Sequence, residues 1–429
     1  MEALGGDHDY DELLSWIGDR PLVLLGEATH GTHEFYRERY RITKRLIEEK
    51  GFIAVAVEAD WPDAYRVNRY VTGDSRDPDA ATALGDFKRF PSWMWRNEDV
   101  ESFINWLRVH NDERRDPMAK ARFYGLDLYS LRASMEAVVS YLNASDPEAA
   151  ERARERYSCF DTVGGEGADY GHAVNMGLHP SCENEVVAEL VDLRRHAMAL
   201  IARDGLIAAD EYFFAEQNAR LVQNAEQYYR AMYQGRVSSW NLRDLHMTET
   251  LSALVEHLGA VLGRSKVVVW EHNSHVGDAR ATELGRSGEY NVGQLARARW
   301  AEDCFLVGFT THHGRVSAAS TWGGPVEHKR VRPGLPGSFE ELLHRGPVDD
   351  FVVRLGAFSP SPLAPVMLER AIGVIYRPDT ERASHWFRAH LAEQFDALVH
   401  LDHTSAVRPL DRTELWDAGE PPETFPSGL

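Results

Sequence analysis

The chain has 429 residues, 43% of them hydrophobic, which is enough for a large buried core. Its formal net charge of −20 excludes nucleic acids and anionic membranes as expected partners, because both repel an acidic surface. We therefore expect a small-molecule substrate. No linker divides the chain, so we expect a single domain over residues 1–429, and the oligomeric state is left open.

The sequence carries no sign of export or of membrane insertion. Its first residues lack a basic segment followed by an apolar run, and no stretch of about 18 apolar residues occurs. The three cysteines, Cys159, Cys182 and Cys304, are odd in number and include no Cys-x-x-Cys pair. A reducing cytoplasm, without disulfides, is therefore the expected compartment.

Short apolar runs bounded by glycine or polar residues predict buried strands. In chain order they are Leu22–Leu25, Phe52–Val57, Arg122–Tyr124, Val267–Trp270, Phe305–Phe309 and Ile372–Tyr376. Apolar residues spaced three or four apart predict helices between them. These helical stripes are Phe35–Leu46, Val100–Leu107, Phe214–Met232 and Met247–Val261. Strands that alternate with helices predict an α/β fold, in which helices flank a mainly parallel central sheet.

The stretch between the third and fourth predicted strands differs from the rest. Residues 131–262 contain no convincing strand, so they predict a large helical insertion that forms a lobe over the cleft. The α/β core would then comprise residues 15–130 and 263–410. Within the lobe, the Gly-rich run 158–184 predicts a loop over the cleft. Segment 325–365 is dense in Pro and Gly and predicts a second loop-rich region.

Four of the predicted strands end in ionisable side chains. In chain order, the residues at these ends are Glu27, His30, Glu58, Asp60, Asp127, His272 and His275. Because the carboxyl ends of parallel strands lie at one edge of a sheet, where ligands bind, we expect these residues to share one cleft. Glutamate and histidine together suit the activation of water by general base catalysis, or metal binding.

Single members of this set also have structural interpretations. Glu27 and His30 suit capping of the following helix, and Glu58 suits a pair with a lysine. Arg39 lies on the inward stripe of that helix, so it needs a carboxylate partner, Glu27 or Glu58, unless its side chain extends to the surface.

Further residues of the sequence are candidates for substrate contact, and two histidines are better explained by a turn. The candidates for substrate contact are Asp60, Trp61, Trp93, Arg96, Asp127 and Tyr229. For the aromatic members, ordinary core packing is an equally good interpretation. His312 and His313 follow the fifth strand, but their pattern is typical of a turn. The sequence contains no Walker A loop, no G-x-S-x-G elbow and no H-E-x-x-H helix.

Several motifs together resemble the erythromycin esterase-like family. They are residues 25–31 (LGEATHG), 58–60 (EAD), 90–97 (FPSWMWRN), 240–244 (WNLRD), 272–275 (HNSH) and 371–378 (AIGVIYRP). The similarity spans residues 21–410, nearly the whole chain. The first motif is closer to an actinobacterial-type branch than to the macrolide-resistance enzymes.

The resemblance implies an α/β core with a helical lobe, and hydrolysis of an ester or lactone, since characterised members open macrolide lactones. In this family the histidine that matches His30 is regarded as the general base. The other positions carried over by their match to the family motifs are Glu27, Arg39, Glu58, His272 and His275.

Our hypothesis is therefore a hydrolase without a cofactor. His30 takes a proton from water, Glu27 or Glu58 orients its ring, and His272 or His275 assists the oxyanion or the leaving alkoxide.

Three alternatives stay open. The first is a divalent metal, such as Zn²⁺ or Mn²⁺, held by Glu27, His30, Glu58, His272 and His275. The second is a biosynthetic elimination, isomerisation or acyl transfer on a natural-product intermediate. The third is a non-catalytic binding module, which would not need so many titratable groups.

Overall fold

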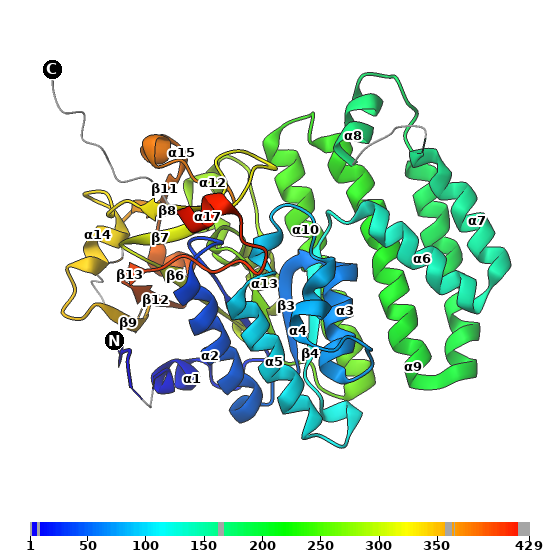
Figure 1. The fold of residues 1–429 in the computed structure, drawn as a ribbon, viewed down its shortest axis with the longest axis horizontal. Coiled ribbons are helices and arrows are strands. Elements are labelled where there is room, and N and C mark those ends of the chain that lie inside the picture. The colour runs from blue at the N-terminus through cyan, green and yellow to red at the C-terminus, as the bar shows by residue number, and fades with distance from the viewer. Residues whose placement is uncertain (1, 7–8, 162–166, 357–362, 364, 419–429) are drawn as a thin grey trace.

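An eight-stranded sheet forms the centre of the computed structural model, which describes residues 2–6, 9–161, 167–356, 363 and 365–418 (Figure 1). Its strands, in spatial order, are β1 (Glu2–Ala3), β9 (Asp350–Arg354), β12 (Ala397–Leu401), β6 (Cys304–Thr310), β2 (Leu22–Leu25), β5 (Val267–Trp270), β3 (Ala54–Asp60) and β4 (Arg122–Asp127). The strands from β12 to β4 run parallel, whereas β9 and β1 add antiparallel pairs at one edge. The predicted α/β fold with a mainly parallel sheet is confirmed.

Between β4 and β5, the described residues form helices and no strand. These helices are α6 (Leu131–Ser145), α7 (Pro147–Tyr157), α8 (Gly167–Asn175), α9 (Glu183–Ala231) and α10 (Arg236–Leu262). Helices α6 to α9 stand together beside the sheet, on the right of Figure 1, and α10 leads back to β5. The helical pattern of residues 131–262 agrees with the sequence, and we keep the division into core and lobe as a proposal. Helix α8 replaces part of the loop expected over residues 158–184, of which 162–166 lie outside the described residues.

Helices cover both faces of the sheet, which explains why β2 and β5 at its centre are apolar at every position. The helices on the second face are α1 (Asp11–Ile17), α2 (His33–Lys50), α3 (Trp61–Thr72) and α5 (Glu98–Asp112). Along β2, Leu22 and Leu24 pack in the cluster that includes α6 to α10, whereas Val23 and Leu25 pack in the cluster with α1, α2, α3 and α5. The alternation of side chains along a strand thus serves two separate cores.

The remaining elements are two small sheets and a set of short helices. The strands are β7 (His313–Ala318), β8 (Glu327–Val331) and β13 (His403–Thr404) in one small sheet, and β10 (Met367–Arg370) and β11 (Trp386–Ala389) in another. The short helices are α4 (Ala80–Ala83), α11 (Asn273–Val276), α12 (Glu283–Arg286), α13 (Val292–Trp300), α14 (Phe339–His344), α15 (Glu381–Ser384), α16 (Leu391–Gln394) and α17 (Glu414–Ala418).

One predicted strand, Ile372–Tyr376, is wrong. This segment makes only isolated bridges, from Ile372 to Thr29 and from Ile375 to Ala319. Ile372 and Tyr376 pack in a small third cluster with residues of β7 and β8, so their apolar character reflects local packing. Strands β9 and β12 were not predicted, and β9 lies in segment 325–365, which we expected to be loop-rich; residues 357–362 and 364 of it lie outside the described residues.

Cys159 and Cys182 form a disulfide, which corrects the expectation that the chain has none. Cys159 lies in the turn after α7 and Cys182 directly precedes α9, and the fold brings their Cα atoms to 6.0 Å. Two of the three cysteines are therefore paired, and the third, Cys304, is a buried free thiol. In the described part of the chain, no helix combines the length and the apolar character needed to cross a membrane.

Candidate active site

A cavity of about 500 Å³ lies at the carboxyl edge of the sheet. The sequence-predicted residues on its wall are His30, Glu58, Asp60, Asp127, His272 and His275. They come from the loop after β2, the ends of β3 and β4, and the segment after β5. Aromatic side chains line much of the remaining wall: Trp95, Tyr129, Trp240, Trp322, Trp386 and Phe387. Side chains that are far apart in sequence thus meet around one cavity.

The first motif folds as a tight loop between β2 and α2. A Cβ atom on Gly26 would lie 2.1 Å from Oδ1 of Asn273, and a Cβ on Gly31 would lie 1.9 Å from the carbonyl oxygen of Ser317. Only glycine fits at either position, which explains the two glycines of the motif. The Tyr36 hydroxyl donates to the carbonyl oxygen of His30 at 2.8 Å and fixes the backbone there.

His30, Glu27 and Arg39 form a chain of contacts behind the cavity wall. Nδ1 of His30 lies 2.9 Å from Oε1 of Glu27, and Oε2 of Glu27 accepts from Nη2 of Arg39 at 2.6 Å. Arg39 is fully buried, and its guanidinium lies over the rings of Tyr36 and Trp270, 4.5 and 5.0 Å from their centroids. These cation–π contacts offset part of its desolvation.

This arrangement fixes the role of each nitrogen in the His30 ring. A carboxylate only accepts hydrogen bonds, so in the neutral ring the proton is on Nδ1 and the lone pair is on Nε2. The partner of Arg39 is Glu27 and not Glu58. The capping interpretation does not hold either, since the N-cap of α2 is Thr32, and Glu27 is bound to His30 and Arg39 instead.

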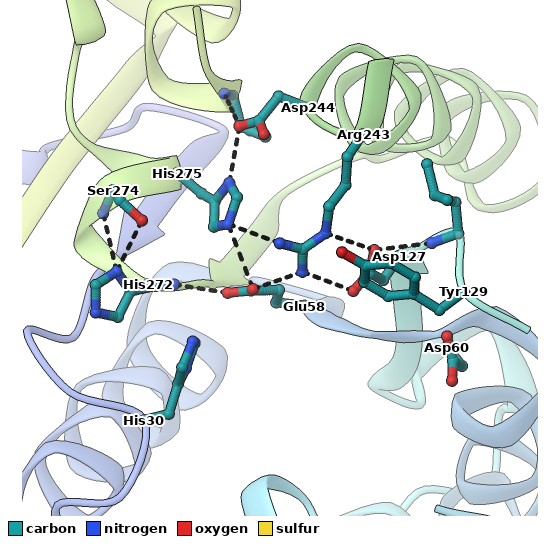
Figure 2. Close-up of polar contacts among 12 residues, drawn as sticks. His30, Glu58, Asp60, Asp127, Tyr129, Arg243, Asp244, His272, Ser274 and His275 are labelled. Carbon is teal, nitrogen blue, oxygen red and sulfur yellow. Dashed lines mark hydrogen bonds and ion pairs between the residues drawn. The ribbon is translucent and has the colours of Figure 1, made fainter. Parts of the chain in front are cut away.

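Glu58 is bound to Arg243, a residue of α10, and not to a lysine. Its Oε1 accepts from Nη2 of Arg243 at 2.7 Å, and its Oε2 accepts from the backbone N–H of His272 at 2.9 Å (Figure 2). Arg243 also donates to both oxygens of Asp127, at 2.9 and 2.7 Å. Burial alone would raise the pKa of Glu58, but His275 and Arg243 hold it well below its usual range.

His275 is held between two carboxylates. Its Nδ1 lies 2.8 Å from Oδ1 of Asp244, its Nε2 lies 3.4 Å from Oε1 of Glu58, and the Trp240 ring stacks on it at 4.6 Å. Burial lowers the pKa of His275, but Asp244 and Glu58 together raise it to about 9. Both ring nitrogens of His275 therefore carry a proton at neutral pH, and the ring is a cation. Its Nε2–H then faces Glu58 and does not accept from Nη1 of Arg243, which lies 3.1 Å away.

His272 is neutral and presents an unpartnered N–H. Burial and the neighbouring His30 lower its pKa to about 3. The backbone N–H of Ser274 donates to its Nδ1 at 3.2 Å, so the proton of the neutral ring is on Nε2. This Nε2 is buried and makes no hydrogen bond of ordinary geometry among the described residues, and the backbone carbonyl of Ala28 lies near the ring. The rings of His30 and His272 lie 4.7 Å apart at the cavity wall (Figure 2).

Of the residues expected to contact substrate, Asp60 and Asp127 line the cavity. Both carboxylates are bound by arginines, since Nε of Arg89 donates to Asp60 at 2.9 Å and Arg243 binds Asp127. Asp63 is a further wall residue. Burial, with the nearby Asp60, raises the pKa of Asp63 to about 8, so its carboxyl group is largely protonated at neutral pH.

Trp61, Trp93, Arg96 and Tyr229 do not line this cavity within the described structure. Trp61 stacks on Tyr124 in the core, and Trp93 is buried in the cluster that covers the other face of the sheet. Arg96 is ion-paired with Asp411 at 2.6 Å, and Tyr229 packs in the helical lobe. The two tryptophans are therefore core residues, as the alternative interpretation of the sequence has it.

The structure adds two site residues that sequence reasoning did not assign, Arg243 and Asp244. Both lie in the 240–244 motif, which was noted only for its resemblance. Their partners lie far away in the chain: 185 residues separate Arg243 from Glu58, and 31 separate Asp244 from His275. The motif was the available signal, but only the fold shows which carboxylate and which imidazole it meets.

The family model described as erythromycin esterase matches residues 47–404, which include Glu58, Arg243, His272 and His275. Erythromycin esterase type II from Escherichia coli is 23% identical over 362 residues, which cover 79% of this chain and 82% of that protein.

Two solved structures share the fold. A Bacillus cereus protein has a TM-score of 0.79 at 20% identity, with 96% of each chain covered. A mutant of the erythromycin esterase EreC in its open conformation has a TM-score of 0.69 at 16% identity, with 95% of this chain and 97% of that chain covered. Because the family model matches most of the sequence, this chain belongs to the erythromycin esterase family.

Proposed function

We propose that the chain is an ester or lactone hydrolase in which His30 activates water. Membership of the erythromycin esterase family supports a hydrolase-type function. The observation that carries the finer proposal is the pair of rings at the cavity wall: the centroids of His30 and His272 lie 4.7 Å apart, Nδ1 of His30 is bound to Glu27, and the buried Nε2 of His272 makes no hydrogen bond of ordinary geometry among the described residues. A base and a hydrogen-bond donor side by side are what the attack of water on a carbonyl group requires.

In the proposed reaction, Nε2 of His30 removes a proton from water as the oxygen attacks the carbonyl carbon. Glu27 stabilises the imidazolium that forms, and Arg39 keeps Glu27 in place. General base assistance of this kind contributes about 10²–10⁴-fold in rate. The negative charge that develops on the carbonyl oxygen is met by the N–H of His272, and one such donor contributes about 10²–10³-fold.

The leaving alkoxide takes its proton from His275. This residue is suited to the task because Asp244 and Glu58 keep it protonated at neutral pH. When the carbon–oxygen bond breaks, Nε2–H of His275 protonates the alkoxide. His275 then regains a proton, either the one that His30 removed from water or one from solvent. The products are a carboxylic acid and an alcohol, which in a lactone remain in one molecule.

The route without a metal is favoured over the metal-dependent alternative by the position of Arg243. Its guanidinium binds Glu58 and Asp127 and lies beside His275, so a fixed cation already neutralises the carboxylates that would otherwise bind a metal. Extensive dialysis against a chelator, with turnover measured before and after, tests this choice. We expect unchanged turnover, and loss that is restored by Zn²⁺ or Mn²⁺ would favour the metal-dependent hydrolase.

The wall of the cavity suggests the substrate class. Apolar and aromatic side chains surround the polar cluster, and the volume of about 500 Å³ suits a bulky ester or lactone. The name of the Escherichia coli relative makes macrolide lactones one class to test.

Hydrolysis in H₂¹⁸O tests the proposed function directly. A panel of macrolides, simple lactones and aryl esters is incubated with the protein, and the products are analysed by mass spectrometry. We expect one ¹⁸O atom in the carboxylate of the product, with the reaction lost in a His30→Asn variant. A product that has lost water would indicate elimination, an unlabelled rearranged product would indicate isomerisation, and no conversion of any compound would favour a binding protein.

A further inference from the structure

A second group of histidines lies outside the cavity, and three segments of the chain contribute to it. His312 follows β6, His344 ends α14, and Asp402 lies between β12 and β13. One ligand atom from each of these residues lies within 4.8 Å of the other two. None of the three lines the cavity described above. We propose that His312, His344 and Asp402 bind a divalent transition metal ion, with Zn²⁺ as the best match to two imidazoles and a carboxylate.

His312 supplies the first argument. Its side chain is buried, with 6% of the residue exposed, yet its Nε2 has no hydrogen-bond partner among the described residues. The closest approach recorded for a carboxylate is Oε2 of Glu341 at 3.5 Å. Its Nδ1 lies 3.0 Å from Nδ1 of His313, so one ring nitrogen is occupied and the other is available. A metal-bound histidine has this arrangement, in which the second nitrogen is held by a neighbouring group.

Asp402 supplies the second argument, because imidazoles surround its carboxylate. Its Oδ1 lies 2.7 Å from Nδ1 of His344 and 3.4 Å from Nε2 of the buried His400. Asp402 itself is 7% exposed. One carboxylate oxygen thus lies within reach of two rings, and a cation at this position would compensate its charge while the rings remain neutral.

The backbone around two of the three ligands is already fixed. The backbone N–H groups of His312 and His313 both donate to the carbonyl oxygen of Asp402 at 3.2 Å. Arg370 donates to the carbonyl oxygens of Thr311 and His312 at 2.6 and 2.8 Å. His312 and Asp402 are therefore positioned before any ion binds, which lowers the entropy lost on binding.

His344 is the ligand that has to move. Its ring lies parallel to that of His312 with 3.8 Å between centroids, and parallel rings cannot both direct a lone pair at the same ion. Ligand atoms of a tetrahedral zinc site lie about 3.3 Å apart, since Zn–N and Zn–O distances are about 2.0–2.2 Å. The side chain of His344 is 41% exposed, so it can turn and approach at little cost. Zinc would then join the β6–β7 turn, α14 and the β12–β13 turn.

The test is zinc binding to the full chain, without a histidine tag, measured by equilibrium dialysis and metal analysis and repeated with Co²⁺ by visible absorption. We expect one high-affinity equivalent in the wild type. The exposed position of His344 makes His344→Gln safe for folding, and both it and His312→Gln should weaken binding by at least about tenfold. Zn²⁺ should raise the melting temperature of the wild type but not of these two variants.

Two control variants separate this site from other sources of binding. His172→Gln removes an exposed histidine of α8 and should leave the affinity unchanged. His272→Asn removes a histidine of the cavity and should also leave it unchanged. The proposal is overturned if the wild type binds no zinc, if His344→Gln binds it as tightly as the wild type, or if only His272→Asn loses it, in which case the cavity holds the metal. None of these outcomes depends on hydrolytic activity.

Discussion

Replacing Asp244 with asparagine should shift the proton equilibrium of His275 by a predictable amount. Oδ1 of Asp244 lies 2.8 Å from Nδ1 of His275, and both groups are buried. The asparagine oxygen can still accept the hydrogen bonds from His275 and from the backbone N–H of Val292, so the change removes a charge and preserves the shape of the contact.

The size of the effect follows from Coulomb's law. Two charges about 4 Å apart at an effective dielectric constant of about 20 interact by about 4 kcal/mol, which corresponds to about 3 pKa units. The pKa of His275, raised to about 9 in the wild type, should therefore fall to about 6 in the variant. At pH 7.5 the protonated fraction drops about 30-fold, and kcat/KM should drop by the same factor if His275 is the acid.

Two measurements check this prediction. NMR titration of ¹⁵N-histidine-labelled protein reports the pKa of His275 directly, and the pH profile of kcat/KM should show its descending limb move from about 9 to about 6. Asp278→Asn is the matched control, because Asp278 is also a buried aspartate but pairs with Arg280 and Arg297 away from the cavity wall. A variant whose His275 titrates as in the wild type would refute the reasoning, whatever its activity.

Three further predictions concern stability. Arg39→Met leaves Glu27 buried without its cation and should lower the free energy of unfolding by about 3–5 kcal/mol, measured by urea denaturation; an unchanged urea midpoint would contradict the buried pair. Gly31→Ala places a Cβ 1.9 Å from the carbonyl oxygen of Ser317 and should cost at least about 2 kcal/mol, and an unaltered melting temperature would show that the loop is not packed as described. The pKa of His275 is raised from 6.5 to about 9 on folding, so its contribution to stability is complete below pH 6.5 and is lost as the pH rises through 9. The loss of stability between pH 6 and pH 10 should be smaller in His275→Asn, and an equal loss in both proteins would exclude this contribution.

Five of the six predicted strands are present in the sheet, because a strand buried on both faces leaves a continuous apolar run in the sequence. Ile372–Tyr376 has the same composition but pairs only at single residues, so composition alone did not distinguish a strand from an apolar loop packed on β7. Strand β9, which lies next to the edge strand β1, was not predicted because its ends are partly exposed and its apolar run is short.

The clustering of acidic residues and histidines at the carboxyl edge could be predicted, because it depends only on the direction of parallel strands. The partners within the cluster could not. Arg243 lies in the 240–244 motif, but the motif does not show its partners, and Arg243 reaches Glu58 and Asp127 because α10 passes over the ends of β3 and β4. The disulfide between Cys159 and Cys182 was concealed for the same reason, since spacing in sequence does not show which two thiols the helices bring together.

The role of His30 is tested most directly by kcat/KM for His30→Ala on the best ester or lactone, beside a His33→Ala control. His33 lies three residues further on, is partly exposed and pairs with Asp99 outside the cavity. Since Nε2 of His30 is the proposed acceptor of the proton from water, the first variant should lose about 10²–10⁴-fold in kcat/KM while keeping the melting temperature of the wild type. The His33→Ala variant should keep its activity. A folded His30→Ala protein that turns over substrate at the wild-type rate would contradict the account.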